Sequence, residues 1–146
     1  MKKVFFVLLF LIFLIWLYSN SLIFVQPQTK AYLYELQTEL EKKDYQPAYF
    51  VISGKRYEWD NWILSKFGGA AKNSRHLNGE AIDLIVLDVN NDGTYDHLDV
   101  DIVYDILNRK IIKNKGGIGT YKNQKGFFNR QMVHFDSRGK RARWHR

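Results

Sequence analysis

Residues 74–83 read Ser-Arg-His-Leu-Asn-Gly-Glu-Ala-Ile-Asp, and four apolar residues follow them at 84–87. The Asn-Gly pair at 78–79 is a strong turn signal, and the nearly continuous apolar run from 81 to 87 predicts a buried strand. Asp83 lies inside this strand. Because an ionised carboxylate in an apolar environment costs several kcal/mol without a cation or hydrogen-bond donors, we expect a positive partner beside Asp83.

Two histidines are candidates for that partner. His76 lies across the Asn-Gly turn from Asp83, and a tight turn can place its imidazole beside the carboxylate. His134 lies in a second β-rich run, at residues 131–135. Two histidines and one carboxylate, with a fourth position left to water, are the ligand set of a catalytic zinc site. The chain contains no cysteine, which excludes disulfides, thiol catalysis and thiolate metal sites.

The same stretch matches a known signature. Residues 74–83 fit the pattern S-x-H-x-x-G-x-A-x-D of the M15 zinc peptidases, which include D-Ala-D-Ala carboxypeptidases and peptidoglycan endopeptidases. Residues 133–136 and the Arg143-Trp144 pair resemble the closing V-H-x-D…R-x-W segment of the small C-terminal-domain subgroup of this family. Flanking matches lie at residues 53–56, 68–71 and 116–121. The chain therefore resembles this family from about residue 50 to residue 144.

The resemblance implies a role for several residues of this chain. It implies that His76, Asp83 and His134 bind Zn²⁺. It also implies that Arg56 steadies the carboxylate or the carbonyl of the substrate, a task for which the planar guanidinium is suited. We assign Ser74, the first residue of the signature, to substrate binding as well.

The general base is an open point. Many relatives have Glu or Asp three residues before the last histidine ligand, where this chain has Gln131, whose amide cannot accept a proton. Asp136 lies two residues beyond His134 and on the same face of the strand, so we expect it to act as the base or to orient a ligand. Other relatives have H-x-H here, so Asp136 could instead be the ligand, with His134 as its catalytic neighbour.

A second candidate cation site lies at residues 88–99. This stretch has oxygen-bearing side chains at positions 1, 3, 5, 9 and 12 and Gly93 at position 6, as in the calcium loop of an EF-hand. The candidate Ca²⁺ ligands are Asp88, Asn90, Asp92, Thr94, Asp96 and Asp99. Position 12 is the shorter Asp rather than Glu, so we expect weak binding and a structural role. The alternative is an acidic turn in which Asp96 or Asp99 caps the following helix.

Hydrophobic periodicity predicts the remaining elements. We expect helices over residues 29–43, 59–67 and 100–112, with glycine pairs at 68–69 and 116–117 closing the last two, and strands over residues 49–52, 81–87 and 131–135, before a basic tail. Neither repeats nor low-complexity linkers divide residues 29–146, which predicts a single α+β domain. The resemblance implies a central, mainly antiparallel sheet flanked by helices, the M15/hedgehog-like peptidase fold.

Residues 1–28 have the pattern of an export segment. Lys2 and Lys3 precede an uncharged run from Val4 to Tyr18, as in a signal peptide with its charged and apolar regions. The apolar run resumes after two serines, so residues 4–25 could also anchor the chain in a membrane. In both cases we expect the domain to work on the periplasmic or extracellular face of the membrane.

Composition and resemblance together indicate a function in the cell wall. The chain has 146 residues and a net charge of +7, which fits one domain and an anionic wall polymer. We expect an exported zinc peptidase, either a D,D-carboxypeptidase or an endopeptidase, that cuts peptidoglycan stem peptides. The alternatives are a phage-type lysin and a non-catalytic wall-binding module, which Gln131 favours. Nucleic acid is not an expected partner, because only Trp144 interleaves the basic tail.

Overall fold

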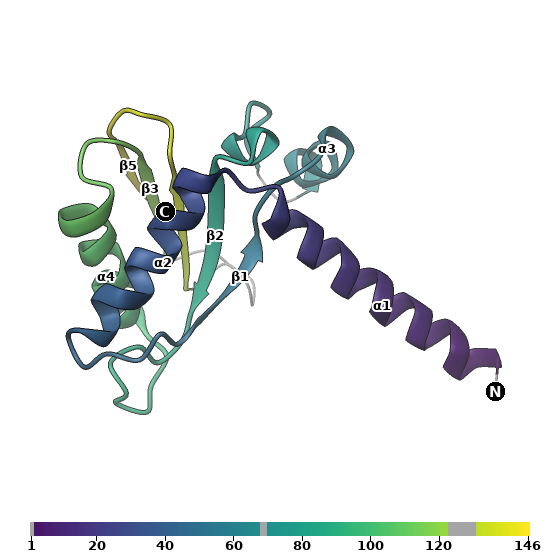
Figure 1. The fold of residues 1–146 in the computed structure, drawn as a ribbon, viewed down its shortest axis with the longest axis horizontal. Coiled ribbons are helices and arrows are strands. Elements are labelled where there is room, and N and C mark those ends of the chain that lie inside the picture. Colours follow the sequence, from purple (N-terminus) through teal and green to yellow (C-terminus); the bar gives the residue numbers. More distant parts are fainter. Residues whose placement is uncertain (1, 68–69, 123–130) are drawn as a thin grey trace.

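The computed structural model describes residues 2–67, 70–122 and 131–146. Its helices are α1 (Lys2–Ile23), α2 (Pro27–Glu41), α3 (Glu58–Phe67) and α4 (His97–Ile106), with a 3-10 turn at Arg75–Asn78 and a π-helical turn at Leu107–Ile111. Its strands are β1 (Tyr49–Ser53), β2 (Ala81–Val86), β3 (Gly117–Tyr121), β4 (Met132–Asp136) and β5 (Ala142–His145). Figure 1 shows the strands grouped into one sheet, with α1 projecting away from it.

The sheet has the strand order β1-β2-β4-β3-β5. Neighbouring strands are antiparallel except β3 and β5, which are parallel. The predicted α+β class, with a mainly antiparallel sheet flanked by helices, is therefore confirmed.

One face of the sheet carries the hydrophobic core. Alternate residues of the inner strands point to this face and pack against α2 and α4: the sheet contributes Ile82, Leu84, Ile118, Val133 and Phe135, and the helices contribute Leu36, Leu40, Val100 and Val103. Because successive side chains of a strand point to opposite faces, the residues between these point away from the core.

The opposite face carries a row of aligned residues. The strand register pairs Ser53 with Asp83, Asp83 with His134, His134 with Gly119 and Gly119 with Trp144. Two of the predicted metal ligands are therefore direct cross-strand neighbours, a relation that the sequence separation of 51 residues conceals.

Helix α1 enters the domain next to the Asn-Gly turn. Its described apolar side chains between Val4 and Leu14 are exposed. A Cβ atom at Gly79 would come within 2.4 Å of the Phe24 carbonyl oxygen, so the close approach of the two segments requires glycine there. Within the described part of the chain, no helix is both long and apolar enough to cross a membrane. The signal peptide or anchor at residues 1–28 stays a prediction.

The helix predicted over residues 100–112 differs from the structure at both ends. Helix α4 begins at His97, and the helical turns end at Ile111, after which Lys113 adopts a left-handed φ of 52°. The prediction that Gly116 and Gly117 close this helix is wrong, because Gly117 is the first residue of β3. The basic tail after residue 135 also contains a strand that the sequence does not predict, β5.

The other two predicted helices are present. Helix α2 starts at Pro27, inside the polar break that the sequence suggests, because proline suits the first position of a helix. Helix α3 does not bury the face that its apolar pattern predicts, because Trp59 and Trp62 are 59% and 60% exposed. Asn61 is buried instead, with 3% of its surface exposed, and its side chain donates to the carbonyl oxygens of Ala71 and Lys72. The glycines at 68–69 that were expected to end α3 lie outside the described residues.

Candidate metal centre

A short 3-10 turn carries the first site residue. Ser74 is its N-cap, and the Ser74 Oγ accepts a hydrogen bond from the His76 backbone N–H at 3.4 Å. Gly79 follows the turn with a φ of 69°, a left-handed conformation that glycine adopts without steric cost. The chain then enters β2. This reversal places His76 beside Asp83, as the Asn-Gly pair predicts.

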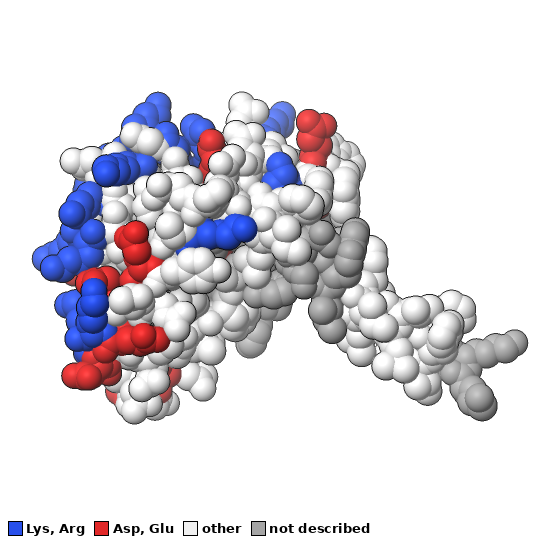
Figure 2. Space-filling view, in the orientation of Figure 1, with Lys and Arg blue, Asp and Glu red and all other residues white. Residues whose placement is uncertain are grey.

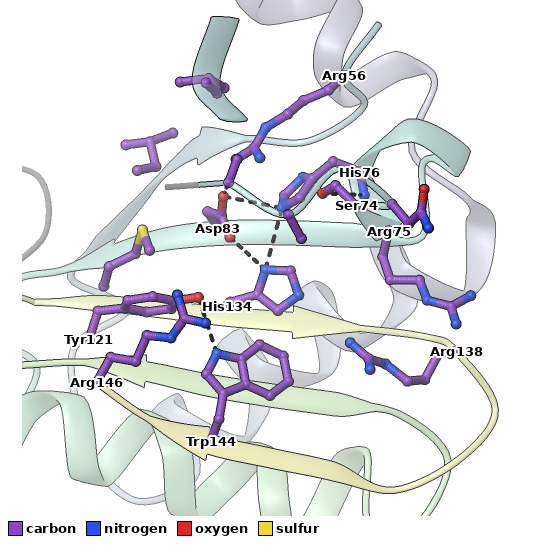
Figure 3. Close-up of a pocket in the computed structure, with 16 residues that line it drawn as sticks. Arg56, Ser74, Arg75, His76, Asp83, Tyr121, His134, Arg138, Trp144 and Arg146 are labelled. Atoms are coloured by element: carbon purple, nitrogen blue, oxygen red, sulfur yellow. Dashed lines mark hydrogen bonds and ion pairs between the residues drawn. The ribbon is translucent and has the colours of Figure 1, made fainter. Parts of the chain in front are cut away.

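The three predicted ligands meet at one buried point (Figure 3). His76 Nε2 lies 3.1 Å from Asp83 Oδ2, and His134 Nδ1 lies 2.7 Å from Asp83 Oδ1. The same two imidazole nitrogens are 3.3 Å apart. One ligand atom from each residue lies within 4.8 Å of the other two, so the group could hold a metal ion.

The outer nitrogen of each imidazole has its own acceptor. His76 Nδ1 lies 2.6 Å from the carbonyl oxygen of Gly54, which can only accept, so we place a proton on Nδ1. His134 Nε2 lies 3.2 Å from Asp136 Oδ2, and the same reasoning places a proton there. In the neutral imidazoles, the lone pairs of His76 Nε2 and His134 Nδ1 then face each other beside a carboxylate. This donor set fits a zinc ion.

Asp136 is fixed behind His134 rather than in the cluster. Arg138 binds its two oxygens at 2.8 and 2.5 Å, and the Gly117 backbone N–H donates to Oδ1 at 2.9 Å. Burial opposes the ionised form, but the hydrogen bond to His134 and the ion pair with Arg138 hold the pKa of Asp136 well below its usual range. The Asp136 carboxylate therefore contacts Nε2 of His134, whereas Nδ1, on the other side of the ring, faces the cluster. Of the three roles predicted for Asp136, which are general base, orienting residue and metal ligand, this geometry favours orienting the ligand.

The ionisation of the cluster follows from burial and mutual contact. Burial opposes the charge on Asp83, but the neighbouring imidazoles hold the pKa of its carboxyl well below the usual range. Burial lowers the pKa of His76, against the attraction of Asp83. Burial also opposes a charged His134, but hydrogen bonds to Asp136 and Asp83 raise the His134 pKa above its usual value. Of the two imidazoles, His134 therefore holds a second proton more tightly.

Arg56 reaches the cluster from the loop that follows β1. Its Nη2 donates to Asp83 Oδ2 at 2.6 Å, and its Nε donates to Ser53 Oγ at 2.8 Å. Its backbone N–H donates to the carbonyl oxygen of His76 at 2.9 Å, which ties this loop to the 3-10 turn. Arg56 is thus one of the positive partners that the sequence predicts beside Asp83.

The three predicted metal ligands line a pocket of about 650 Å³. The predicted substrate-binding residues Arg56 and Ser74 both line it, together with three further arginines. Asp83 is the only carboxylate residue in its described lining. Because the four pocket arginines outnumber the three acidic residues that pair with them, Asp83, Glu80 and Asp136, the pocket favours a ligand that carries negative charge.

Trp144 forms one side of this pocket, a position that the sequence does not predict for it. Its ring centroid lies 5.2 Å from that of His134, and its Nε1 donates to the Tyr121 hydroxyl at 3.1 Å. A Cβ atom at Gly119 would come within 2.2 Å of the Trp144 ring, so glycine is required beneath it. The resemblance of residues 143–144 to the closing segment of the family, and the glycine-rich match at residues 116–121, are the sequence signals that point to it.

Gln131 takes no part in the cluster. Its Nε2 donates to the Asp96 carbonyl oxygen at 3.0 Å, at the end of the acidic loop. With Asp136 held by Arg138, the described pocket lining offers no carboxylate that is free of the metal-ligand group. The identity of a general base therefore stays a prediction.

The loop at residues 88–99 is held together by its own side chains. Asp88 accepts hydrogen bonds from the backbone N–H groups of Asp92 and Gly93 at 3.0 and 2.9 Å. Asp96 caps α4, and Asp99 completes a capping box with it. The capping alternative is thus observed, and calcium binding by this loop stays a prediction.

Comparisons with known proteins give one structural resemblance. No protein-family model matches the chain, and no curated protein sequence matches it. A solved structure with a similar arrangement is the crystal structure of the L-Ala D-Glu endopeptidase ChiX of Serratia marcescens. The TM-score is 0.48 and the sequence identity 17%, over 82% of this chain and 84% of that chain. A similarity at this level does not establish a function, so the function proposed for this chain rests on its own residues.

Proposed function

We propose that this chain is a zinc-dependent peptidase that hydrolyses peptide bonds in peptidoglycan stem peptides, as a D,D-carboxypeptidase or an endopeptidase. The observation that carries the proposal is the convergence of two imidazole nitrogens and the Asp83 carboxylate on one buried point in a pocket. An acceptor behind each imidazole fixes its orientation, as is usual for histidine ligands of zinc. Three protein ligands leave one tetrahedral position open, which is typical of catalytic zinc.

The residues around this point have separate tasks in hydrolysis. When bound, zinc supplies Lewis-acid activation of a water molecule and of a peptide carbonyl. Asp136 holds His134 in the tautomer whose Nδ1 carries the lone pair. Arg56 lies at the pocket side of Asp83, where its donors can bind a substrate carboxylate or the negative charge that develops on the carbonyl oxygen.

The substrate class is supported by two independent features. Residues 74–83 match the M15 signature at all five of its fixed positions, and this family contains peptidoglycan peptidases. The arginines of the pocket suit a peptide that carries carboxylates. We also propose that residues 1–28 direct the domain to the periplasmic or extracellular face, where this substrate lies.

A second candidate function is a wall-binding module that holds zinc and a peptide without turnover. The observation that favours it is the pocket lining, in which the described residues include no carboxylate free to act as a general base. Gln131, which occupies the place of the acid found in many relatives, points the same way.

The experiment that separates the two candidates is mass spectrometry of peptidoglycan fragments incubated with the zinc-loaded full chain in detergent. We expect loss of a terminal D-Ala from a carboxypeptidase, or opened cross-links from an endopeptidase. The matched control is His76→Ala, which removes a ligand and leaves the pocket arginines in place. Intact fragments with wild-type protein that retains zinc would contradict the peptidase and favour the binding module.

A further inference from the structure

A row of aromatic and cationic side chains leads away from the metal centre along β3 and β5. Trp144 contacts the His134 ring and donates to the Tyr121 hydroxyl. The Arg146 guanidinium carbon lies 5.9 Å from the centroid of the Tyr121 ring. All of these side chains line the same pocket, and Figure 3 shows Tyr121 and Arg146 together on one side of Trp144.

The backbone of Arg146 is fixed although the residue follows β5. Its N–H donates to the Thr120 carbonyl oxygen at 2.9 Å, and its carbonyl oxygen accepts from the Lys122 N–H at 2.7 Å. Because these bonds extend the parallel pairing, Arg146 points to the same face as Trp144. Residues two apart on a strand are roughly 6–7 Å apart, so Arg146 lies one step farther along the pocket than Trp144.

Arg146 differs from the other pocket arginines in whether an acidic side chain neutralises its charge. Each of the others forms an ion pair within the domain: Arg56 with Asp83, Arg75 with Glu80, and Arg138 with Asp136. Among the described residues, no ion pair involves Arg146. Its side chain is held against an aromatic ring instead, which keeps all of its guanidinium donors available to a ligand.

We propose that Arg146 and Tyr121 form a subsite for a second carboxylate of the substrate, one or two residues from the scissile peptide bond. The inference rests on the proposed function and deepens it, because it names the substrate as an acidic peptide rather than any stem peptide. An extended peptide advances at most about 3.3–3.6 Å per residue, and the side chains of the substrate residue and of Arg146 add their own length, so a residue one or two positions from the bond at the metal centre can present its carboxylate to Arg146.

The chemistry of this subsite discriminates a carboxylate from its amide. A guanidinium presents paired donors that match the two oxygens of a carboxylate, whereas a carboxamide offers one acceptor and no charge. A hydrogen-bonded charged pair of this kind is expected to favour the acidic peptide by about tenfold to a hundredfold in kcat/KM.

The test uses pairs of synthetic stem peptides that differ only in a carboxylate or a carboxamide. One pair has the substituted residue one position from the cleaved bond, and a second pair has it two positions away. We expect the zinc-loaded wild-type chain to prefer the acidic peptide and Arg146→Gln to lose that preference. The matched control is Arg141→Gln, an exposed arginine outside the pocket that bonds to Asn108, and this variant should keep the preference.

The outcomes separate this inference from the proposed function. Equal kcat/KM within both pairs in the wild type, or an unchanged preference in Arg146→Gln, would overturn the subsite while leaving the peptidase intact. If the wild type hydrolyses none of these peptides, the proposed function fails, and calorimetric binding of the same peptides then tests the subsite alone. A binding preference that Arg146→Gln removes would support it, and equal binding would overturn it.

Discussion

The His134 ring is held by side chains from three strands, β2, β4 and β5. Asp83 contacts its Nδ1, Asp136 contacts its Nε2, and Trp144 packs against its ring. The imidazole can therefore neither flip nor rotate without losing a charged partner. Changes at any of these contacts should appear first as changes in metal affinity.

Zinc binding should release a proton at pH 6.5. The pKa of His134 is raised above the usual histidine value of about 6.5, so at that pH most metal-free molecules carry a second proton on His134, which a metal ligand must give up. Zinc affinity should accordingly rise with pH until His134 is neutral in the metal-free protein. Calorimetry at pH 6.5 in buffers of different ionisation enthalpy measures the release, and an identical binding enthalpy in all of them would contradict it.

Asp136→Asn should destabilise the fold by about 3 kcal/mol in neutral solution, because it leaves Arg138 without its buried partner. The folded-state pKa of Asp136 is depressed, so its stabilising effect is present above about pH 3.9, the usual unfolded-state value, and is lost as the pH falls below it. The gap between wild type and variant should shrink below pH 4. Urea unfolding at several pH values tests this, and a constant gap would count against the ion pair.

At the residue scale, the sequence predicts the proposed metal ligands and an orienting role for Asp136, but not the other residues that support the ligands. Asp83 is identifiable because a carboxylate in an apolar strand is costly, and His76 because a turn signal separates it from Asp83. The roles of Gly119 and Trp144 depend on cross-strand register, and the pairing of Asp136 with Arg138 depends on side-chain direction. Neither leaves a periodic pattern in the sequence.

The 3-10 turn and β3 are the elements that position the site. The turn brings His76 to the sheet, and β3 lets Trp144 approach because its central residue has no side chain. Strand β3 is not predicted because two of its residues are glycines, and β5 is not predicted because it lies within a basic stretch that resembles a solvated tail. The pattern located α3 correctly but misjudged which face is buried, because Asn61 makes its hydrogen bonds inside the domain.

Gly119→Ala tests the role of β3. The new methyl group would come within 2.2 Å of the Trp144 ring and force it away from His134. We expect a loss of about 1–3 kcal/mol in the free energy of unfolding, together with weaker zinc binding. The control is Gly93→Ala, where no atom lies within 4 Å but the positive φ strains an alanine, so stability should fall without loss of zinc affinity. Unchanged zinc affinity in Gly119→Ala would contradict a positioning role for this contact.

Asp88→Ala tests the acidic loop. The variant loses two hydrogen bonds to backbone N–H groups, so we expect it to be less stable by about 1–2 kcal/mol even in the presence of a chelator. If the loop binds calcium as the sequence predicts, calcium raises the melting temperature of the wild type and has no effect on the variant. Equal wild-type melting temperatures with calcium and with chelator would count against a calcium loop.

At the scale of the whole domain, the hydrophobic core and the candidate site lie on opposite faces of one sheet. Apolar residues fill the face under α2 and α4, while the proposed metal ligands face the pocket on the other side of the sheet. Figure 2 shows most of the Lys and Arg side chains of this face on the side of the molecule away from α1, with Asp and Glu side chains among them, whereas α1 is white over its described part. If residues 1–28 hold the chain at a membrane, this distribution turns the charged side of the domain away from that attachment.

The most direct test of the metal centre is the zinc X-ray absorption spectrum of the full chain loaded with one equivalent of zinc. We expect two imidazole nitrogens at roughly 2.0–2.1 Å and a carboxylate oxygen at roughly 2.0–2.2 Å in a four-coordinate shell. The His76→Ala and Asp83→Ala variants should fail to retain the ion. A spectrum with only oxygen neighbours, or full zinc occupancy in either variant, would contradict the assignment of His76, Asp83 and His134 as the metal ligands.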